Sequence, residues 1–324
     1  MERKRILVFG AGVIGSIYGG LLAESGADVT LLARGKRLSE LREQGLALQK
    51  VSCKEGATHE VLHPSVHLIE VLTPDDVYDY IFVTLRAEQV AEALPQLAAN
   101  ASPTFVFMIN NAHGYTAWEQ ALGKGRVLPA FPGAGGSIKE GIVQYGIVQQ
   151  QVQPTVLGEI DGTLSPRLYT LQRLLREAGF CTTIQRNMDA WQKTHLALVC
   201  PLACALYYDG GNNYSLANNR KALLLTGKSI RENLSFLKRA GIDITPRRVA
   251  ALRFIPKGLM CDLLNNIFAS RWAETFVLEH SLKARTEMLY LTEQLLDLAQ
   301  QRGFALSSLQ TLLGSMPLVE KNRV

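Results

Sequence analysis

Short, continuously apolar runs alternate with amphipathic, helix-like segments through the first 140 residues of the 324-residue chain. Apolar runs without polar alternation are typical of parallel strands that are covered on both faces. Such runs occupy residues 5–9, 28–33, 79–85, 104–109 and 126–131. Helical spacing is found between them, at residues 16–25, 36–43, 88–99 and 115–122. The pattern predicts an α/β fold with a Rossmann-type, doubly wound parallel sheet.

The residue pattern of the chain changes twice after this region. Residues 141–160 are rich in Val, Ile and Gln and are punctuated by glycine, which predicts hairpins that extend the sheet. After a helix at 165–178 and a short strand at 181–185 the strand signal disappears. Helical patterns then follow at residues 188–206, 219–240, 246–251, 260–268 and 276–302. We therefore expect an α/β domain at residues 1–186 and an all-α C-terminal domain at residues 187–324.

The first predicted strand runs directly into a glycine-rich turn with the pattern G-x-G-x-x-G. The turn is Gly10-Ala11-Gly12-Val13-Ile14-Gly15, and a helix is predicted to follow it. Gly10 permits the tight turn, Gly12 lets the backbone approach a pyrophosphate, and Gly15 lets the helix pack closely on the strand. Since the required strand and helix flank the motif, it predicts a dinucleotide-binding site.

The end of the second predicted strand indicates which dinucleotide binds. An NAD site usually carries an acidic residue there, bonded to the ribose 2′-hydroxyl. This strand instead leads into Arg34-Gly-Lys-Arg37, with three cations and no carboxylate. Such a loop favours the 2′-phosphate of NADP(H), with Arg34 as the expected contact. Lys36 and Arg37 are either further contacts or a solvated charge cluster.

Composition and charge narrow the classes of function. With 47% hydrophobic and 19% charged residues, the chain has enough apolar material for a substantial core. The net charge of +5 is not gathered into a basic block, so we expect an anionic cofactor and substrate and no nucleic-acid partner. The first strand begins close to Met1 and no apolar run reaches membrane-spanning length, which predicts no signal peptide and no membrane partner. Five cysteines without a C-x-x-C pair indicate reduced thiols in the cytoplasm and no metal site.

Four further segments carry a family resemblance. They are Ile109-Asn-Asn-Ala-His-Gly114, Asp189-Ala-Trp-Gln-Lys193, Pro201-Leu-Ala-Cys-Ala-Leu206 and Arg285-Thr-Glu-Met288. Together with the glycine-rich turn and Arg34, they make the chain resemble the ketopantoate reductase (2-dehydropantoate 2-reductase) family over nearly its whole length. The resemblance implies an enzyme that uses NADPH to reduce a small 2-keto acid to the 2-hydroxy acid.

The resemblance also implies roles for individual residues. Lys193 and Glu287 match the catalytic Lys and Glu of the family, and Asn111 matches an Asn that binds the nicotinamide ribose and the substrate. Gln89 matches a cofactor-binding position. Arg86 stands where the family typically has a lysine, so its positive charge is kept but its geometry differs. Thr275 takes the place of a family serine and is a candidate substrate contact.

The chemistry of carbonyl reduction agrees with this assignment. Hydride addition to a ketone leaves negative charge on the oxygen, which a proton donor or a fixed cation must meet. From the residues alone, Lys193 is equally well interpreted as a catalytic lysine or as a lysine whose side chain reaches out to water. Glu287 reads as an ion-pair partner of Lys283, and Asn111 as an ordinary turn residue. The match to the family favours the catalytic reading.

The chain departs from the family on the Lys193 helix. Ala197 and Cys200 stand where the family places asparagines one and two turns after the lysine. Loss of these polar contacts predicts that the reaction is kept and the substrate is changed, with ketopantoate itself a poor substrate.

Two alternative functions remain open at this point. One is another hydroxyacid or opine-type dehydrogenase of the same architecture, which would turn over an amine or a β-hydroxyacid. The other is a non-catalytic NADP(H)-binding sensor, although such a sensor has no need for both Lys193 and Glu287. The sequence leaves open whether the chain forms a homodimer and whether it acts in pantothenate biosynthesis.

Overall fold

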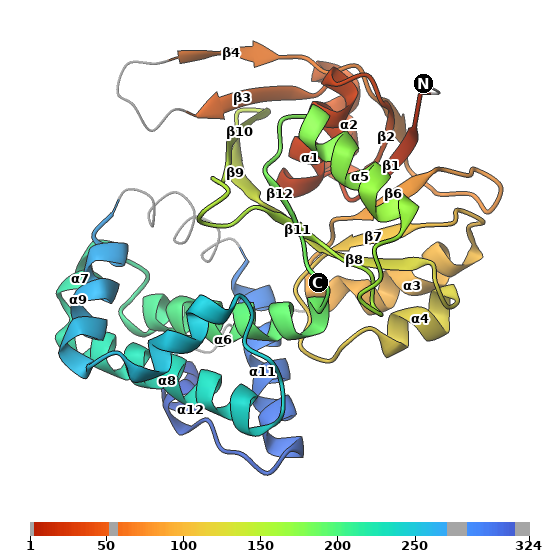
Figure 1. Cartoon of the computed structure of the whole chain (residues 1–324). Coiled ribbons are helices and arrows are strands. Elements are labelled where there is room, and N and C mark those ends of the chain that lie inside the picture. Colours follow the sequence, from red (N-terminus) through yellow and green to blue (C-terminus); the bar gives the residue numbers. More distant parts are fainter. Residues whose placement is uncertain (1–2, 52–57, 271–283, 315–324) are drawn as a thin grey trace. The chain divides into compact units, whose positions relative to one another are not determined.

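The computed structural model describes residues 3–51, 58–270 and 284–314 of the chain. It divides into two compact units. The first comprises Met1–Asn110 and Gly114–Met188, and the second comprises Asn111–His113 and Asp189–Val324. The first unit combines strands and helices, whereas the described part of the second contains only helices (Figure 1). An α/β unit followed by a helical one confirms the predicted fold class.

The main sheet of the first unit has the strand order β12-β11-β8-β7-β6-β1-β2-β5. The bounds are β1 (Arg5–Phe9), β2 (Asp28–Leu32), β5 (His67–Ile69), β6 (Tyr80–Val83), β7 (Phe105–Met108), β8 (Val127–Phe131), β11 (Thr155–Leu157) and β12 (Thr182–Ile184). Neighbouring strands from β8 to β5 run parallel. The chain moves outward from β1 in both directions, through β2 on one side and through β6 on the other. In such sheets ligands bind beyond the carboxyl ends of the strands at this switch point.

The far edge of the main sheet departs from the parallel arrangement of the other strands. β11 pairs antiparallel with β8, and β12 then pairs parallel with β11, so the last two strands run against the rest.

A second, four-stranded sheet corrects the prediction for residues 141–160. The strands β4 (Thr58–Leu62), β3 (Ala47–Val51), β10 (Ile142–Ile147) and β9 (Ala134–Lys139) pair in that order. The β9–β10 hairpin therefore joins β3 instead of extending the main sheet, and only β11 from the predicted region continues the main sheet. The prediction was wrong because the partner of the hairpin lies 95 residues earlier in the chain, beyond the reach of local patterning.

The helices of the first unit follow the expected alternation with strands. They are α1 (Val13–Glu24), α2 (Gly35–Gln44), the short 3₁₀ helix η1 (Ala87–Gln89), α3 (Val90–Ala99), α4 (Thr116–Leu122) and α5 (Pro166–Glu177). β1, β6 and β7 are buried along almost their whole length, as continuous apolar runs require. Removal of this surface from water is the main term that holds the unit together.

The helices of the second unit begin with α6 (Met188–Tyr208). The other helices in its described part are α7 (Asn213–Asn218), α8 (Arg220–Arg239), the 3₁₀ helix η2 (Arg247–Phe254), α9 (Lys257–Phe268), α11 (Arg285–Gln301) and α12 (Ser307–Gly314). The α-helix predicted at 246–251 is thus a 3₁₀ helix, and α7 and α12 were not predicted. No helix in the described ranges is both long enough and apolar enough to cross a membrane.

A buried amide compensates for a proline inside α6. Pro201 has no N–H, so it cannot donate the helical hydrogen bond to the carbonyl oxygen of Ala197, four residues earlier. The side-chain Nδ2 of Asn233, on α8, donates to that oxygen at 3.2 Å. Asn233 is fully buried, so this bond supplies a partner where water has no access.

Candidate functional site

The glycine-rich turn after β1 can be built only with glycine at two positions. Gly10 has a φ of +117°, in the region that side chains disfavour. A Cβ on Gly15 would lie 1.9 Å from the carbonyl oxygen of Gly10, and the hydroxyl of Thr84 donates to that same oxygen at 2.7 Å. A Cβ on Gly12, in contrast, would have no atom within 4 Å. The turn is therefore packed tightly at both ends and open in its middle.

The start of α1 adds a favourable electrostatic environment to this open position. No side chain caps the helix, whose N-cap residue is Gly12. The N–H groups of its first turn, at Val13 and Ile14 among others, have no acceptor within the helix, and the helix dipole adds positive potential. Free space at Gly12 beside these donors fits the pyrophosphate of a dinucleotide.

The three cations that follow β2 differ in how they are held. Arg34 is exposed and donates through Nη2 to Oε1 of Gln96, on α3, at 2.6 Å. The Lys36 side chain is 91% exposed and lies 3.8 Å from Glu40. The Arg37 side chain is only 17% exposed, and it bonds the glycine-rich turn. The structure thus distinguishes Lys36, which is exposed, from Arg37, which is held by the turn, whereas the sequence gives no reason to treat them differently.

Arg86 and Gln89 follow β6, the neighbour of β1 in the sheet. Both are exposed, and the backbone N–H of Arg86 donates to Oε1 of Gln89 at 3.2 Å. Because β1 and β6 are parallel neighbours, these residues lie at the same edge of the sheet as the glycine-rich turn.

Two asparagines follow β7 in the chain, and they belong to different units. Asn110 closes a segment of the first unit, and its buried Oδ1 has no hydrogen-bond partner among the described residues. An orphaned acceptor of this kind fits a ligand donor that is bound at the edge.

Asn111 begins the three-residue segment that groups with the second unit. It is 5% exposed, and its Oδ1 accepts from the backbone N–H of His113 at 2.9 Å. The backbone N–H of Ala112 donates to Oε1 of Gln294, on α11, at 3.1 Å. Sequence reasoning missed Gln294, although it lies seven residues, or two helical turns, after Glu287 and therefore on the same face of α11.

Lys193 lies in the second turn of α6 and does not reach out to water. The residue is 7% exposed, and its Nζ donates to the two carboxylate oxygens of Asp189 at 2.5 and 2.6 Å. The adjacent Gln192 and Thr194 are also buried. A buried ammonium is costly unless it is paired. The sequence signal for this pairing was the i, i+4 spacing of Asp189 and Lys193.

Glu287 is partly buried in the first turn of α11. α11 contacts α6, because Oγ1 of Thr292 lies 3.7 Å from Sγ of Cys204. The second unit therefore holds the Asn111 segment and both helices that carry the predicted catalytic pair. Lys283, the alternative partner of Glu287, and Thr275 lie outside the described residues.

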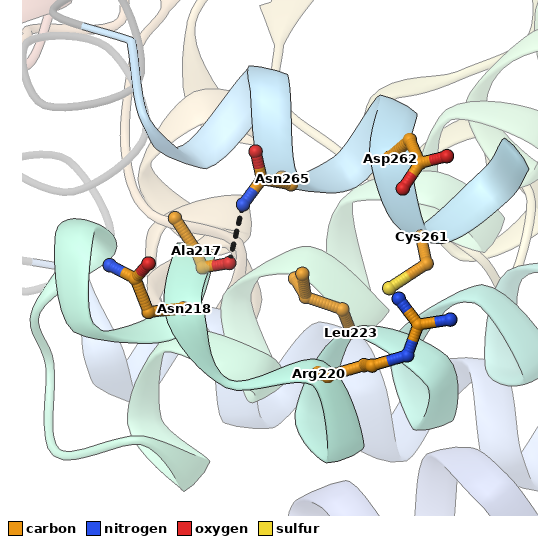
Figure 2. A pocket seen from close by; sticks show the side chains of 7 residues that line it. All are labelled: Ala217, Asn218, Arg220, Leu223, Cys261, Asp262 and Asn265. Carbon is orange, nitrogen blue, oxygen red and sulfur yellow. Dashed lines mark hydrogen bonds between the residues drawn. The ribbon is translucent and has the colours of Figure 1, made fainter. Parts of the chain in front are cut away.

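Two surface pockets of the second unit are lined by other residues. One, of about 180 Å³, lies between α7, α8 and α9, where Nδ2 of Asn265 donates to the Ala217 carbonyl at 2.7 Å (Figure 2). The other, of about 410 Å³, is lined by Asp297, Gln300 and Gln301. No predicted site residue lines either pocket. The described residues also contain no group of three His, Cys, Asp or Glu side chains that could hold a metal ion.

Comparison with known proteins gives consistent matches. Residues 6–162 match the family model described as ketopantoate reductase PanE/ApbA. A 2-dehydropantoate 2-reductase of Pyrococcus horikoshii is 26% identical over 251 residues, which cover 75% of this chain and 77% of that protein.

Two solved structures extend the likeness to the whole chain. The 2-dehydropantoate 2-reductase of Geobacter metallireducens superposes with a TM-score of 0.76 at 18% identity, over 96% of this chain and 98% of the other. D-mandelate dehydrogenase, in a ternary structure with NADH and anilino(oxo)acetate, gives 0.74 at 14% identity over 96% of both chains. At these identities the two structures establish the fold.

Proposed function

Because the chain belongs to the ketopantoate reductase family, we propose that it is a reductase that converts a small 2-keto acid into the 2-hydroxy acid with NADPH. The family match and the curated relative support an oxidoreductase that acts on CH–OH groups. NADPH as the donor, the class of 2-keto acid and the roles of individual residues are our proposal. The observation that carries it is the buried, carboxylate-paired ammonium of Lys193.

The glycine-rich turn is the proposed binding site for the pyrophosphate of the cofactor. Gly10, Ala11, Gly12, Val13, Ile14 and Gly15 would hold the pyrophosphate, since the space at Gly12 is open and the start of α1 is uncapped. Arg34 would bind the 2′-phosphate, and Arg86, Gln89 and Asn111 would bind other parts of the cofactor. When bound, the dihydronicotinamide would supply the hydride for the carbonyl carbon.

Lys193 is proposed to act on the carbonyl oxygen. Its ammonium would stabilise the negative charge that develops on that oxygen and would donate the proton that completes the hydroxyl group. Burial strengthens this interaction because little water screens it. Asp189 keeps the ammonium paired until the substrate arrives.

Glu287 and Asn111 are proposed to orient the substrate, together with Thr275. A carboxylate can accept a hydrogen bond from the hydroxyl group of the product, and an amide can both donate and accept. The bond between Ala112 and Gln294 fixes the Asn111 segment on α11, the helix that carries Glu287. Such fixation reduces the cost of ordering the site when the substrate binds.

The proposed substrate is bulkier or less polar than ketopantoate. Ala197 and Cys200 are fully buried, and neither provides the amide of the family asparagines. Burial raises the pKa of the Cys200 thiol, so it stays neutral and a weak hydrogen-bonding group. The fold also occurs in D-mandelate dehydrogenase bound to anilino(oxo)acetate, a ligand with an aromatic ring. Aromatic 2-keto acids therefore belong among the substrates to be tested.

A screen for NADPH oxidation tests this function. Purified protein is mixed with NADPH or NADH and with branched, aromatic and linear 2-keto acids, ketopantoate included. We expect turnover with NADPH on at least one bulky 2-keto acid. NADPH oxidation only when an amine is added together with the 2-keto acid would favour an opine-type dehydrogenase, and oxidation only with β-keto acids would favour another hydroxyacid dehydrogenase. Tight NADPH binding with no turnover of any compound would favour a sensor.

A further inference from the structure

Arg37 is attached to the glycine-rich turn by its own side chain. Its Nε donates to the carbonyl oxygen of Ala11 at 3.2 Å, and its Nη2 donates to Oγ of Ser16, in α1, at 3.3 Å. Ser16 is fully buried, and its hydroxyl donates to the same Ala11 oxygen at 3.2 Å. Two hydrogen bonds therefore hold the guanidinium against the glycine-rich turn and the start of α1.

A fixed guanidinium is a better phosphate receptor than a mobile one. An arginine presents five N–H donors in a rigid plane, and Arg37 uses some of them on the turn and on Glu40. An anion that binds such a group does not have to immobilise it. Arg34 and Lys36 are more exposed, so each loses more freedom when it binds.

Glu40 adds an opposing charge to this cluster. Its carboxylate lies 3.3 Å from Nη1 of Arg37 and 3.8 Å from Nζ of Lys36. Three cations and one carboxylate leave a net charge of about +2 at the end of β2. A phosphate monoester carries about −1.5 to −2 at pH 7, so the cluster is matched to a single 2′-phosphate group.

We infer that Arg37 is the fixed phosphate-reading residue of the NADP(H) site, and that Glu40 is the counter-charge that limits how tightly the 2′-phosphate binds. The inference rests on the proposed function only in that the chain must bind an NADP-type cofactor. It assigns the discrimination between NADPH and NADH to Arg37 together with Arg34, and it leaves Lys36 only a weak, long-range contribution through its charge.

The test uses two fragments of the cofactor that differ only in the phosphate. Binding of 2′,5′-ADP and of 5′-AMP is measured by titration calorimetry, with no substrate and no turnover. Arg37→Ala should weaken 2′,5′-ADP about 10- to 100-fold, as expected for a lost charge-assisted hydrogen bond, and 5′-AMP less than about 3-fold. Lys36→Ala is the matched control and should change both affinities less than about 3-fold.

Glu40→Gln distinguishes direct phosphate binding by Arg37 from a purely structural role of Arg37 in the turn. It removes the opposing charge and should strengthen 2′,5′-ADP about 2- to 5-fold without strengthening 5′-AMP. If Arg37→Ala weakened both fragments equally, Arg37 would only support the turn and the inference would be wrong. Arg37→Lys provides a check on folding, since it keeps the charge and loses the planar contact.

The outcomes also separate this inference from the proposed function. If the wild-type protein bound the two fragments equally, the preference for NADPH itself would be wrong. If it preferred 2′,5′-ADP and Arg37→Ala kept that preference, the function would stand and the role of Arg37 would be refuted.

Discussion

Replacement of Lys193 by methionine should abolish most of the turnover without unfolding the protein. Methionine has nearly the length of lysine and fills the same buried space, so the change removes the ammonium and little else. Asp189 keeps a side chain that is 40% exposed and can be hydrated once its partner is gone. The variant therefore does not leave a buried, unpaired charge.

The sizes of the two effects differ enough to be told apart. The Lys193–Asp189 pair has one buried and one partly exposed member, so its loss should cost about 1 kcal/mol of folding free energy. Loss of a general acid lowers kcat about 10²- to 10⁴-fold, which is about 3–5 kcal/mol of transition-state stabilisation. A rate effect of that size cannot come from the expected change in stability.

The assay compares kcat at saturating substrate, NADPH affinity by fluorescence and the thermal midpoint for each protein. Lys228→Met is the matched control, because Lys228 makes an i, i+4 pair with Glu232 at 3.6 Å while its side chain is 65% exposed. We expect a low kcat only for Lys193→Met, with NADPH affinity nearly unchanged in both variants. Wild-type turnover by Lys193→Met would refute the role of the lysine.

Three further predictions follow from the geometry. Gly12→Val should fold normally, because its Cβ meets no atom within 4 Å, but should bind NADPH at least about 10-fold more weakly in a titration. Asn233→Leu leaves the Ala197 carbonyl unpaired and should destabilise the protein by about 1–3 kcal/mol in urea unfolding. In a Pro201→Ala background, which restores the missing N–H, the same change should cost clearly less. Equal costs in both backgrounds would contradict this account. Burial lowers the pKa of His195 from 6.5 to about 4. Between these pH values the unfolded chain therefore binds a proton at His195 that the folded chain does not bind. Stability should fall as the pH drops from 6.5 towards 4, and His195→Phe should flatten that slope in urea titrations at pH 7 and pH 5.

The sequence was sufficient for the elements whose signal is local. The continuous apolar runs that became β1, β6 and β7 are long enough to be buried on both faces, and a helix with its own apolar face separates each from the next strand. The glycine-rich turn was predictable because backbone sterics restrict Gly10 and Gly15 to glycine whatever surrounds them.

Non-local contacts account for most of what was missed. The second sheet joins β3 to β10 across 95 residues, and no periodicity in either segment indicates its partner. The Asn111 segment groups with the helical unit through Gln294, a contact that spans 182 positions.

The same reason explains why the sequence could not distinguish Arg37 from Lys36 in the loop after β2. From its place at the end of β2, Arg34 was the expected phosphate contact, and this remains a prediction. Side-chain fixation separates Arg37 from Lys36, and it depends on the position of the Ala11 carbonyl in the folded turn. No spacing rule along the chain contains that information.

Isotope transfer tests the central claim most directly. The protein is given NADPH that carries deuterium at the transferable C4 position, together with the 2-keto acid that it turns over best, and the product is analysed by mass spectrometry and NMR. The account predicts a 2-hydroxy acid with one deuterium on C2, formed by wild-type protein and at least about 100-fold more slowly by Lys193→Met. A product without deuterium on C2, or no consumption of any 2-keto acid by a protein that binds NADPH, would contradict it.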